Sequence, residues 1–177
     1  TAVRPAFNLN LSTVLFTSAA AGGKSIGTVG TLSAVNDYTG NEWKLTLLDG
    51  GRAGFDVNVN GQQSASAAAG ESVQITYSGA QTGTNEYVSA LLCDSDDKVL
   101  YYGSIAQNSA GGTAALSIPA GLAAGSYTLK VFSEQCNGDY RTDYASAFQE
   151  ISLKILSKET TPQAAFTATG DNSGTLS

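Results

Sequence analysis

The feature that most constrains this chain is the alternation of apolar and polar residues along several short stretches. In residues 55–60, Phe-Asp-Val-Asn-Val-Asn, the alternation is unbroken. A period of two puts every apolar side chain on one face of an extended strand, so such stretches predict half-buried β-strands. In residues 87–93 apolar side chains occupy both sets of alternate positions, which is typical of a central strand covered on both faces. The other stretches with the alternating pattern are residues 43–47, 72–77, 114–118 and 149–155.

Clusters of turn-forming residues separate these stretches. Residues 94–97, Asp-Ser-Asp-Asp, lie between residues 87–93 and 98–102 and predict a hairpin, because Asp and Ser side chains bond to their own backbone. No 11-residue window has a helical repeat, and a single turn at 142–147 is the best helix candidate. Short strands with turns at this spacing predict an all-β sandwich or barrel.

Residues 122–131, Leu-Ala-Ala-Gly-Ser-Tyr-Thr-Leu-Lys-Val, favour the sandwich over the barrel. In immunoglobulin-like sandwiches a tyrosine at the start of the sixth strand bonds the backbone a few residues upstream, and Gly125 would permit the tight turn before Tyr127. The alternative is an ordinary turn followed by a core tyrosine. We therefore expect an immunoglobulin-like antiparallel β-sandwich of about seven strands with an N-terminal extension.

We expect this sandwich to span residues 40–156. Residues 1–39 are the end of an upstream domain or an N-terminal extension, with a strand-like stretch at 7–11. Residues 157–177, polar and interrupted by Pro162, are a linker into a next module. The residues expected to face inward include Trp43, Leu45, Val57, Val73, Ile75, Ala90, Leu116, Tyr127, Leu129, Val131, Ile151 and Leu153. The residues expected to face outward are Lys44, Asp56, Gln74, Lys130 and Lys154.

The composition argues against several functions. Histidine is absent, which removes the commonest general base and zinc ligand, so we expect no enzyme activity, no cofactor and no metal centre. Charged residues make up 14% of the chain and the net charge is −6, which gives no basic surface for nucleic acid or anionic lipid. No apolar run is long enough for a membrane helix, so we expect no membrane insertion.

The two cysteines are not expected to pair with each other. Cys93 closes the expected strand at 87–93, whereas Cys136 follows the expected strand at 125–134. In an antiparallel pair of these strands the two thiols lie at opposite ends, far beyond the ~7 Å between Cα atoms that a disulfide spans.

The loop at 134–147 is the best candidate for a ligand-binding surface. Tyr140, Arg141 and Tyr144 are residue types that dominate binding energies, and Glu86 closes the loop at 79–86, which is expected at the same end of the sandwich. The alternative is that the tyrosines fold back and cap that end. The acidic turn at 94–97 offers oxygens for Ca²⁺ but lacks the glycine and distant glutamate of an EF-hand, which favours a solvated hairpin tip.

In residues 37–48, 70–77, 99–103, 129–135 and 137–140 the sequence resembles immunoglobulin-like segments of large, repetitive surface proteins from gut Firmicutes (clostridia). The resemblance covers about residues 30–156; residues 3–12 resemble the close of a preceding domain and residues 162–170 the start of a following repeat. It implies a bacterial cell-surface or wall-associated setting with neighbouring domains of the same chain as partners, and it implies no activity.

Two functions fit these observations. The first is a non-catalytic structural spacer module of a multidomain, extracellular protein. The second is an adhesion module that binds a protein or glycan through the loops at 79–86 and 134–147. A lysine–asparagine amide crosslink, plausible in sandwiches of such a setting, would need a buried lysine beside a carboxylate. Lys44, Lys130 and Lys154 fall on the polar phase of their strands, so we do not expect one.

Overall fold

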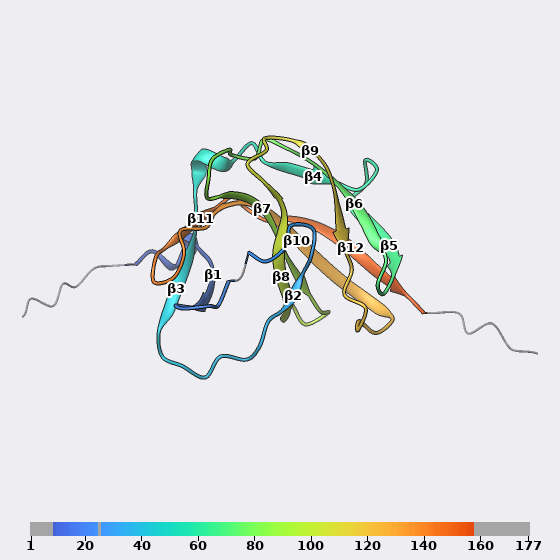
Figure 1. The fold of residues 1–177 in the computed structure, drawn as a ribbon, viewed down its shortest axis with the longest axis horizontal. Helices are drawn as coiled ribbons and strands as arrows, with labels where there is room; N and C mark the ends of the chain where they lie inside the picture. The colour runs from blue at the N-terminus through green and yellow to red at the C-terminus, as the bar shows by residue number, and fades with distance from the viewer. Residues whose placement is uncertain (1–8, 25, 158–177) are drawn as a thin grey trace, which may run out of the picture.

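The computed structural model describes residues 9–24 and 26–157, which form twelve strands and two short 3-10 turns and contain no α-helix. The expected all-β class is therefore confirmed, with more strands than the seven predicted. Nine strands make one mixed, curled sheet, and three make a smaller sheet that lies across its upper face (Figure 1). The larger sheet contains β1 (Val14–Ala19), β2 (Ser33–Ala34), β3 (Trp43–Leu48), β5 (Ser64–Ala68), β7 (Glu86–Cys93), β8 (Val99–Gln107), β10 (Gly125–Gln135), β11 (Asp143–Ala145) and β12 (Gln149–Leu156). The smaller sheet contains β4 (Asp56–Asn58), β6 (Ser72–Ser78) and β9 (Gly112–Ser117), and the 3-10 turns are η1 (Leu11–Thr13) and η2 (Gly50–Arg52).

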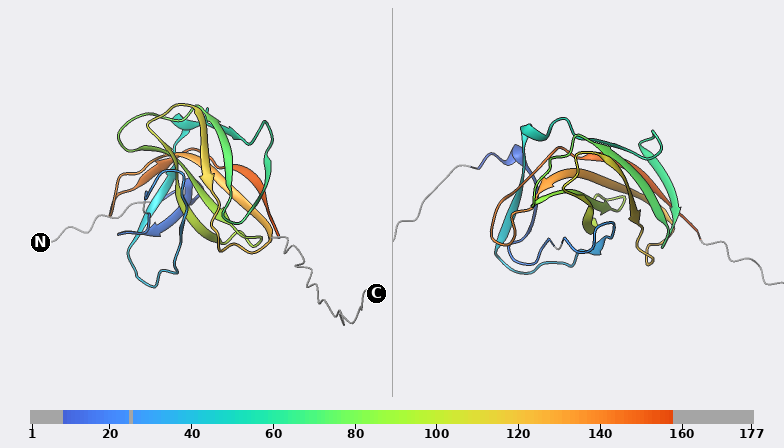
Figure 2. Two further views of the ribbon diagram at one scale, coloured as in Figure 1. Left: turned by 45° about the vertical axis from the view of Figure 1, so that its right-hand side comes forward. Right: turned by 45° about the horizontal axis from the view of Figure 1, so that its top comes forward.

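The longest strand, β10, organises the larger sheet. One edge of β10 pairs antiparallel with β7, which forms the predicted hairpin with β8. The other edge pairs with β12 along its first half and with β11 at its end. From there β12 continues to β5, and β11 continues to β3 and β1, so the sheet branches and curls at its ends (Figures 1 and 2).

The main core lies between the two sheets. Val57 and Ile75 of the smaller sheet and Leu92, Leu129 and Ile151 of the larger sheet are fully buried there. Asp56, Gln74 and Lys154, on the opposite phase, are exposed. The predicted faces of these strands are therefore confirmed.

A second apolar cluster covers the other face of the central strands. Leu91 and Cys93 of β7 and Phe132 of β10 are buried there, and Phe16 of β1 and Phe148 pack against them. The prediction that the strand at 87–93 is covered on both faces is thus confirmed. Its second cover includes residues from the N-terminal segment, which continues the larger sheet through β1 and β2.

The predicted orientation of β3 is wrong. Lys44 and Thr46 are buried, with Lys44 only 5% exposed, whereas Trp43 is 51% exposed. The reason is that β3 lies between β1 and β11 at the curled end of the sheet, where its inner face meets the carboxylate of Asp143 instead of the apolar core. The side chains of β3 do alternate, but its polar residues face inward.

The remaining predictions concern short segments of the chain, and some of them are wrong. The hydroxyl of Tyr127 donates to the carbonyl of Ala123 at 3.0 Å, as expected for the turn that precedes β10. The helical turn expected at 142–147 is instead β11, which pairs with β3 and β10. Residues 9–11 contain no strand, and the rest of the stretch at 7–11 lies outside the described residues.

The cysteines lie as the strand order predicted. Thr128 faces Cys93 across the β7–β10 pair, and Gln135 faces Glu86, so Cys93 and Cys136 lie at opposite ends of β10. Both are free thiols. Burial raises the pKa of Cys93 to about 11, so this side chain is a neutral, buried group at physiological pH.

Adjacent residues of β12 test the assigned faces. Replacing Leu153, which is fully buried, with alanine removes core methylene groups and is expected to lower the free energy of unfolding by about 2–5 kcal/mol. Lys154→Ala, one residue on and exposed, is expected to change it by less than about 0.5 kcal/mol. Urea unfolding of both variants measures this difference, and equal losses would mean that β12 is oriented wrongly.

Candidate functional site

Five polar side chains from five separate segments meet at the curled end of the larger sheet. Lys24 follows β1, Lys44 lies on β3, Tyr102 on β8, Glu134 at the end of β10 and Asp143 on β11. The side chains of Glu134 and Asp143 are fully buried, and those of the two lysines almost so. We call these five residues the buried ionic cluster.

Lys24 is at the centre of the buried ionic cluster. Its ammonium group donates to Oε2 of Glu134 and, at 2.8 Å, to Oδ2 of Asp143. Its Nζ also lies 5.1 Å from the ring centroid of Phe16 and 5.4 Å from that of Tyr102, which are favourable distances for a cation above an aromatic face. Burial lowers the pKa of Lys24, but the two carboxylates more than offset this, so its pKa lies above the ordinary value.

Asp143 receives donors on both of its oxygens. Oδ2 lies 2.8 Å from the Nζ of Lys44 as well as that of Lys24, and Oδ1 accepts the backbone N–H of Asn137 at 2.8 Å. Lys44 is held in turn by the carbonyl of Gly138 at 2.8 Å. These donors offset the large free energy that an isolated buried carboxylate would cost.

Glu134 binds Tyr102 as well as Lys24. The tyrosine hydroxyl donates to Oε1 of Glu134. Burial raises the pKa of Tyr102 well above its ordinary value, and the adjacent carboxylate raises it further, so the hydroxyl keeps its proton. With two lysines and two carboxylates, the buried ionic cluster has no net charge.

A second buried ion pair lies on the core face of the same sheet. Arg52 of η2 binds Glu86 of β7 through two hydrogen bonds of 2.6 and 2.9 Å, which is the bidentate geometry that guanidinium and carboxylate favour. Arg52 also contacts Ser133 of β10 at 3.3 Å, and Gln135 donates to Glu86 at 3.2 Å. Glu86, 7% exposed, is therefore engaged within the fold rather than presented to a ligand.

The other predicted binding residues differ from Glu86 in exposure, although Gln135 of β10 pairs with Glu86 on one side and with Tyr144 on the other. Tyr140 is 67% exposed and Tyr144 40% exposed, and Arg141 is exposed as well. The loops that carry these residues do meet, because the N–H of Cys136 donates to the carbonyl of Asn85 at 2.9 Å. Tyr140 and Tyr144 therefore point outward and do not cap the core.

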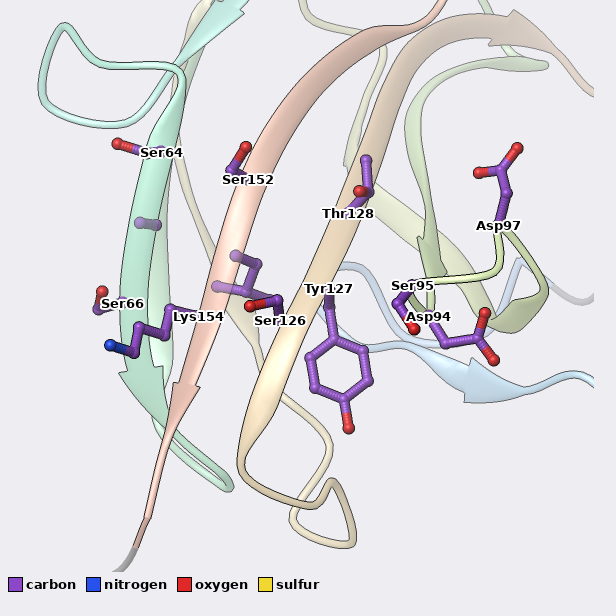
Figure 3. Close-up of a pocket in the computed structure, with 12 residues that line it drawn as sticks. Ser64, Ser66, Asp94, Ser95, Asp97, Ser126, Tyr127, Thr128, Ser152 and Lys154 are labelled. Carbon is purple, nitrogen blue, oxygen red and sulfur yellow. The ribbon is translucent and has the colours of Figure 1, made fainter.

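A shallow polar hollow of about 580 Å³ lies over β5, β12 and the start of β10 (Figure 3). Small hydroxyl side chains line it, together with the acidic turn at 94–97. Oδ1 of Asp94 accepts the N–H groups of Asp96 and Lys98, and Asp97 forms an ion pair with Lys130 at 2.7 Å. These carboxylates hold the hairpin turn, and within residues 9–24 and 26–157 no group of three potential metal ligands comes together.

A second hollow, of about 450 Å³, lies between the N-terminal segment and the larger sheet. Lys24 and Tyr102 of the buried ionic cluster form part of its wall. The exposed rings of Tyr38 and Trp43 stand near its rim in an edge-to-face contact, with centroids 4.7 Å apart. The buried ionic cluster is therefore next to a route to solvent.

Sequence reasoning missed the buried ionic cluster. Lys24 lies in a Gly/Ser/Ala-rich segment with no periodic pattern. The alternation in residues 43–47 predicts that Lys44 faces outward from its strand. The one local signal was Glu134. It lies two residues after Phe132, so the two side chains share one face of β10, and both are buried. A carboxylate on the buried phase of a central strand requires a cation, but the sequence alone does not identify which one.

Comparisons with known proteins add no further constraint. No protein-family model matches the chain, and no curated protein or solved structure is significantly similar to it. In the part of the chain that the structure describes, no helix is long and apolar enough to cross a bilayer.

The Arg52–Glu86 pair is expected to contribute strongly to stability. Glu86→Gln removes the buried counter-charge of Arg52 and leaves only the partly exposed carboxylate of Asp49, 3.1 Å from Nε. It is expected to lower the free energy of unfolding by about 3 kcal/mol. Combining Arg52→Met with Glu86→Leu removes both charges and should recover much of that loss. The matched control is Lys98→Met, because Lys98 and Asp37 form an exposed pair 3.7 Å apart, for which we expect less than about 1 kcal/mol. Denaturant unfolding that shows the same small effect in both single variants would contradict this account.

Proposed function

We propose that this chain is a non-catalytic structural module, an immunoglobulin-like sandwich that acts as a spacer in a multidomain bacterial cell-surface protein. Neighbouring domains of the same chain are its partners, and its setting is extracellular or wall-associated. The setting rests on the resemblance of residues 30–156 to segments of clostridial surface proteins.

Strand order supports the immunoglobulin-like assignment. Five strands of the larger sheet follow the order β5-β12-β10-β7-β8 and face β4-β6-β9, which corresponds to the division of such folds into two sheets. The hydroxyl of Tyr127 bonds upstream of the strand that takes the place of strand F. In this assignment β1, β2, β3 and β11 are additions at the far side of the larger sheet.

One observation carries the spacer function: charged side chains that a binding or catalytic site would need are instead buried within the fold. Lys24, Lys44, Arg52, Glu134 and Asp143 are all buried in ion pairs that join separate strands. Groups engaged in this way hold the fold together and are not available to bind or transform a substrate. The described chain also begins and ends at opposite ends of the long axis of the molecule, as a module in a linear array requires (Figure 1).

The second candidate, adhesion, is favoured by a separate observation. Tyr140 exposes its ring on the loop between β10 and β11, next to the exposed Arg141, and Tyr144 exposes its ring on β11. Aromatic and arginine side chains of this kind dominate binding surfaces.

A binding screen separates the two functions. The labelled chain and its Tyr140→Ala variant are applied to a glycan array and to immobilised extracellular matrix proteins. A spacer is expected to give no saturable signal that differs between the two chains. Saturable binding that Tyr140→Ala reduces at least tenfold would contradict the spacer function and support adhesion.

A further inference from the structure

The buried ionic cluster places one amine against two carboxyl groups. Lys24 is the lysine that contacts both Glu134 and Asp143, and all three side chains are shielded from water. The rings of Phe16 and Tyr102 lie next to the Nζ of Lys24. An amine and a carboxyl group held in contact in this way have the components of an amide bond.

The carboxyl group of Asp143 is arranged as an electrophile. Lys44 and the backbone N–H of Asn137 contact different oxygens of this group, at 2.8 Å each. Donors placed on both oxygens stabilise the negative charge that develops when a nucleophile adds to the carboxyl carbon. Among residues 9–24 and 26–157, no backbone N–H donates to the carboxylate of Glu134, and its Oε1 accepts the Tyr102 hydroxyl.

Glu134 is arranged as a proton carrier. Its Oε2 accepts a hydrogen bond directly from the Nζ of Lys24, so a proton can pass between the two groups without a movement of the backbone. Transfer of that proton leaves a neutral amine, which is the nucleophilic form of lysine. In a site of low dielectric the transfer also removes two buried charges.

We propose that Lys24 and Asp143 condense to an amide bond, which forms an internal crosslink of this chain, and that Glu134 carries the proton. The Nζ of Lys24 loses a proton to Glu134 and attacks Cγ of Asp143. The N–C bond forms while the C–Oδ2 bond breaks, and the departing oxygen takes the proton from Glu134 and a second proton from the nitrogen. Overall, an ammonium and a carboxylate become an amide and one water, with no oxidant or further reactant.

Proximity supplies most of the rate. Groups held in reactive contact behave as if present at effective concentrations on the order of 10⁵–10⁸ M. Exclusion of water disfavours the reverse hydrolysis, and the hollow that Lys24 and Tyr102 help to line gives the released water a path out.

Lys44 is not the reacting amine in this account. Its Nζ contacts Asp143 and the carbonyl of Gly138, and neither neighbour can accept its proton while the carboxyl of Asp143 is the electrophile. Its positive charge next to Oδ2 instead stabilises the developing oxyanion.

The crosslink would join the segment after the first strand to the strand that precedes the last one. Lys24 follows β1, the first strand, and Asp143 lies a few residues before β12, the last strand. Tension applied between the ends would then pass through the amide and leave residues 25–142 unstretched. The proposal concerns the chemistry of the chain and stands or falls separately from the spacer function, because the mass of the chain reports the amide whatever the chain does.

The intact mass of the full, denatured chain tests the proposal directly. The expected mass is lower than the sequence mass by one water. Trypsin then separates the possible attachments, since Asp143 falls in the peptide of residues 142–154 and Glu134 in that of residues 131–141. Acylated Lys24 resists cleavage, so we expect residues 1–44 joined to residues 142–154.

Every other digest overturns the assignment. A full sequence mass with free cleavage after Lys24 means that the cluster is an ordinary set of ion pairs. Residues 1–44 joined to residues 131–141 would place the bond on Glu134, and residues 25–52 joined to residues 142–154 would place it on Lys44.

Variants test the roles within the site. Lys24→Arg is expected to keep the full sequence mass, and Glu134→Gln is expected to slow the loss of water at least tenfold. Lys130→Arg is the matched control, because Lys130 also pairs with carboxylates but at the surface, and it should lose water as the native chain does. Unchanged loss of water in Glu134→Gln would contradict the role of Glu134. The native digest decides the crosslink even if a variant fails to fold.

Discussion

The fold depends on the buried ionic cluster at the end of β10. Glu134 and Asp143 are fully buried, and each would be prohibitively costly to bury alone. Lys24 and Lys44 supply the compensating charges, from the segment after β1 and from β3 at the curled end of the larger sheet. The ion pairs therefore help to hold the N-terminal segment and β3 in the larger sheet, together with the packing of Phe16 against Phe132.

Much of the sandwich could be predicted from the sequence, because its strands follow one local rule. Along β6 and β12 the apolar residues alternate and face the core, and Tyr127 bonds upstream as its spacing indicates. The antiparallel pairing of β7 with β10 could be predicted as well, and it places Cys93 and Cys136 at opposite ends of β10. These features depend on the alternation of side chains within one strand or on the pairing of neighbouring strands.

The candidate site could not be predicted in the same way, because it depends on contacts between distant segments. In β3 the apolar phase faces outward, since the curled sheet surrounds a charged interior at that point. In β5 the sequence Ser-Ala-Ser-Ala-Ala has no large side chain to reveal a strand, and its pairing partner β12 is far along the chain. Lys24 has no pattern around it, and only the fold brings it to Glu134.

Hydrogen exchange at the backbone amides of β1 tests most directly whether the buried charges make the N-terminal segment part of one cooperative unit. The account predicts that the amides of Val14–Ala19 that bond to β3 open with the same free energy as those of β10. In Lys24→Met the β1 amides should lose protection first. Rapid exchange of β1 in the native chain, while β10 remains protected, would contradict the account.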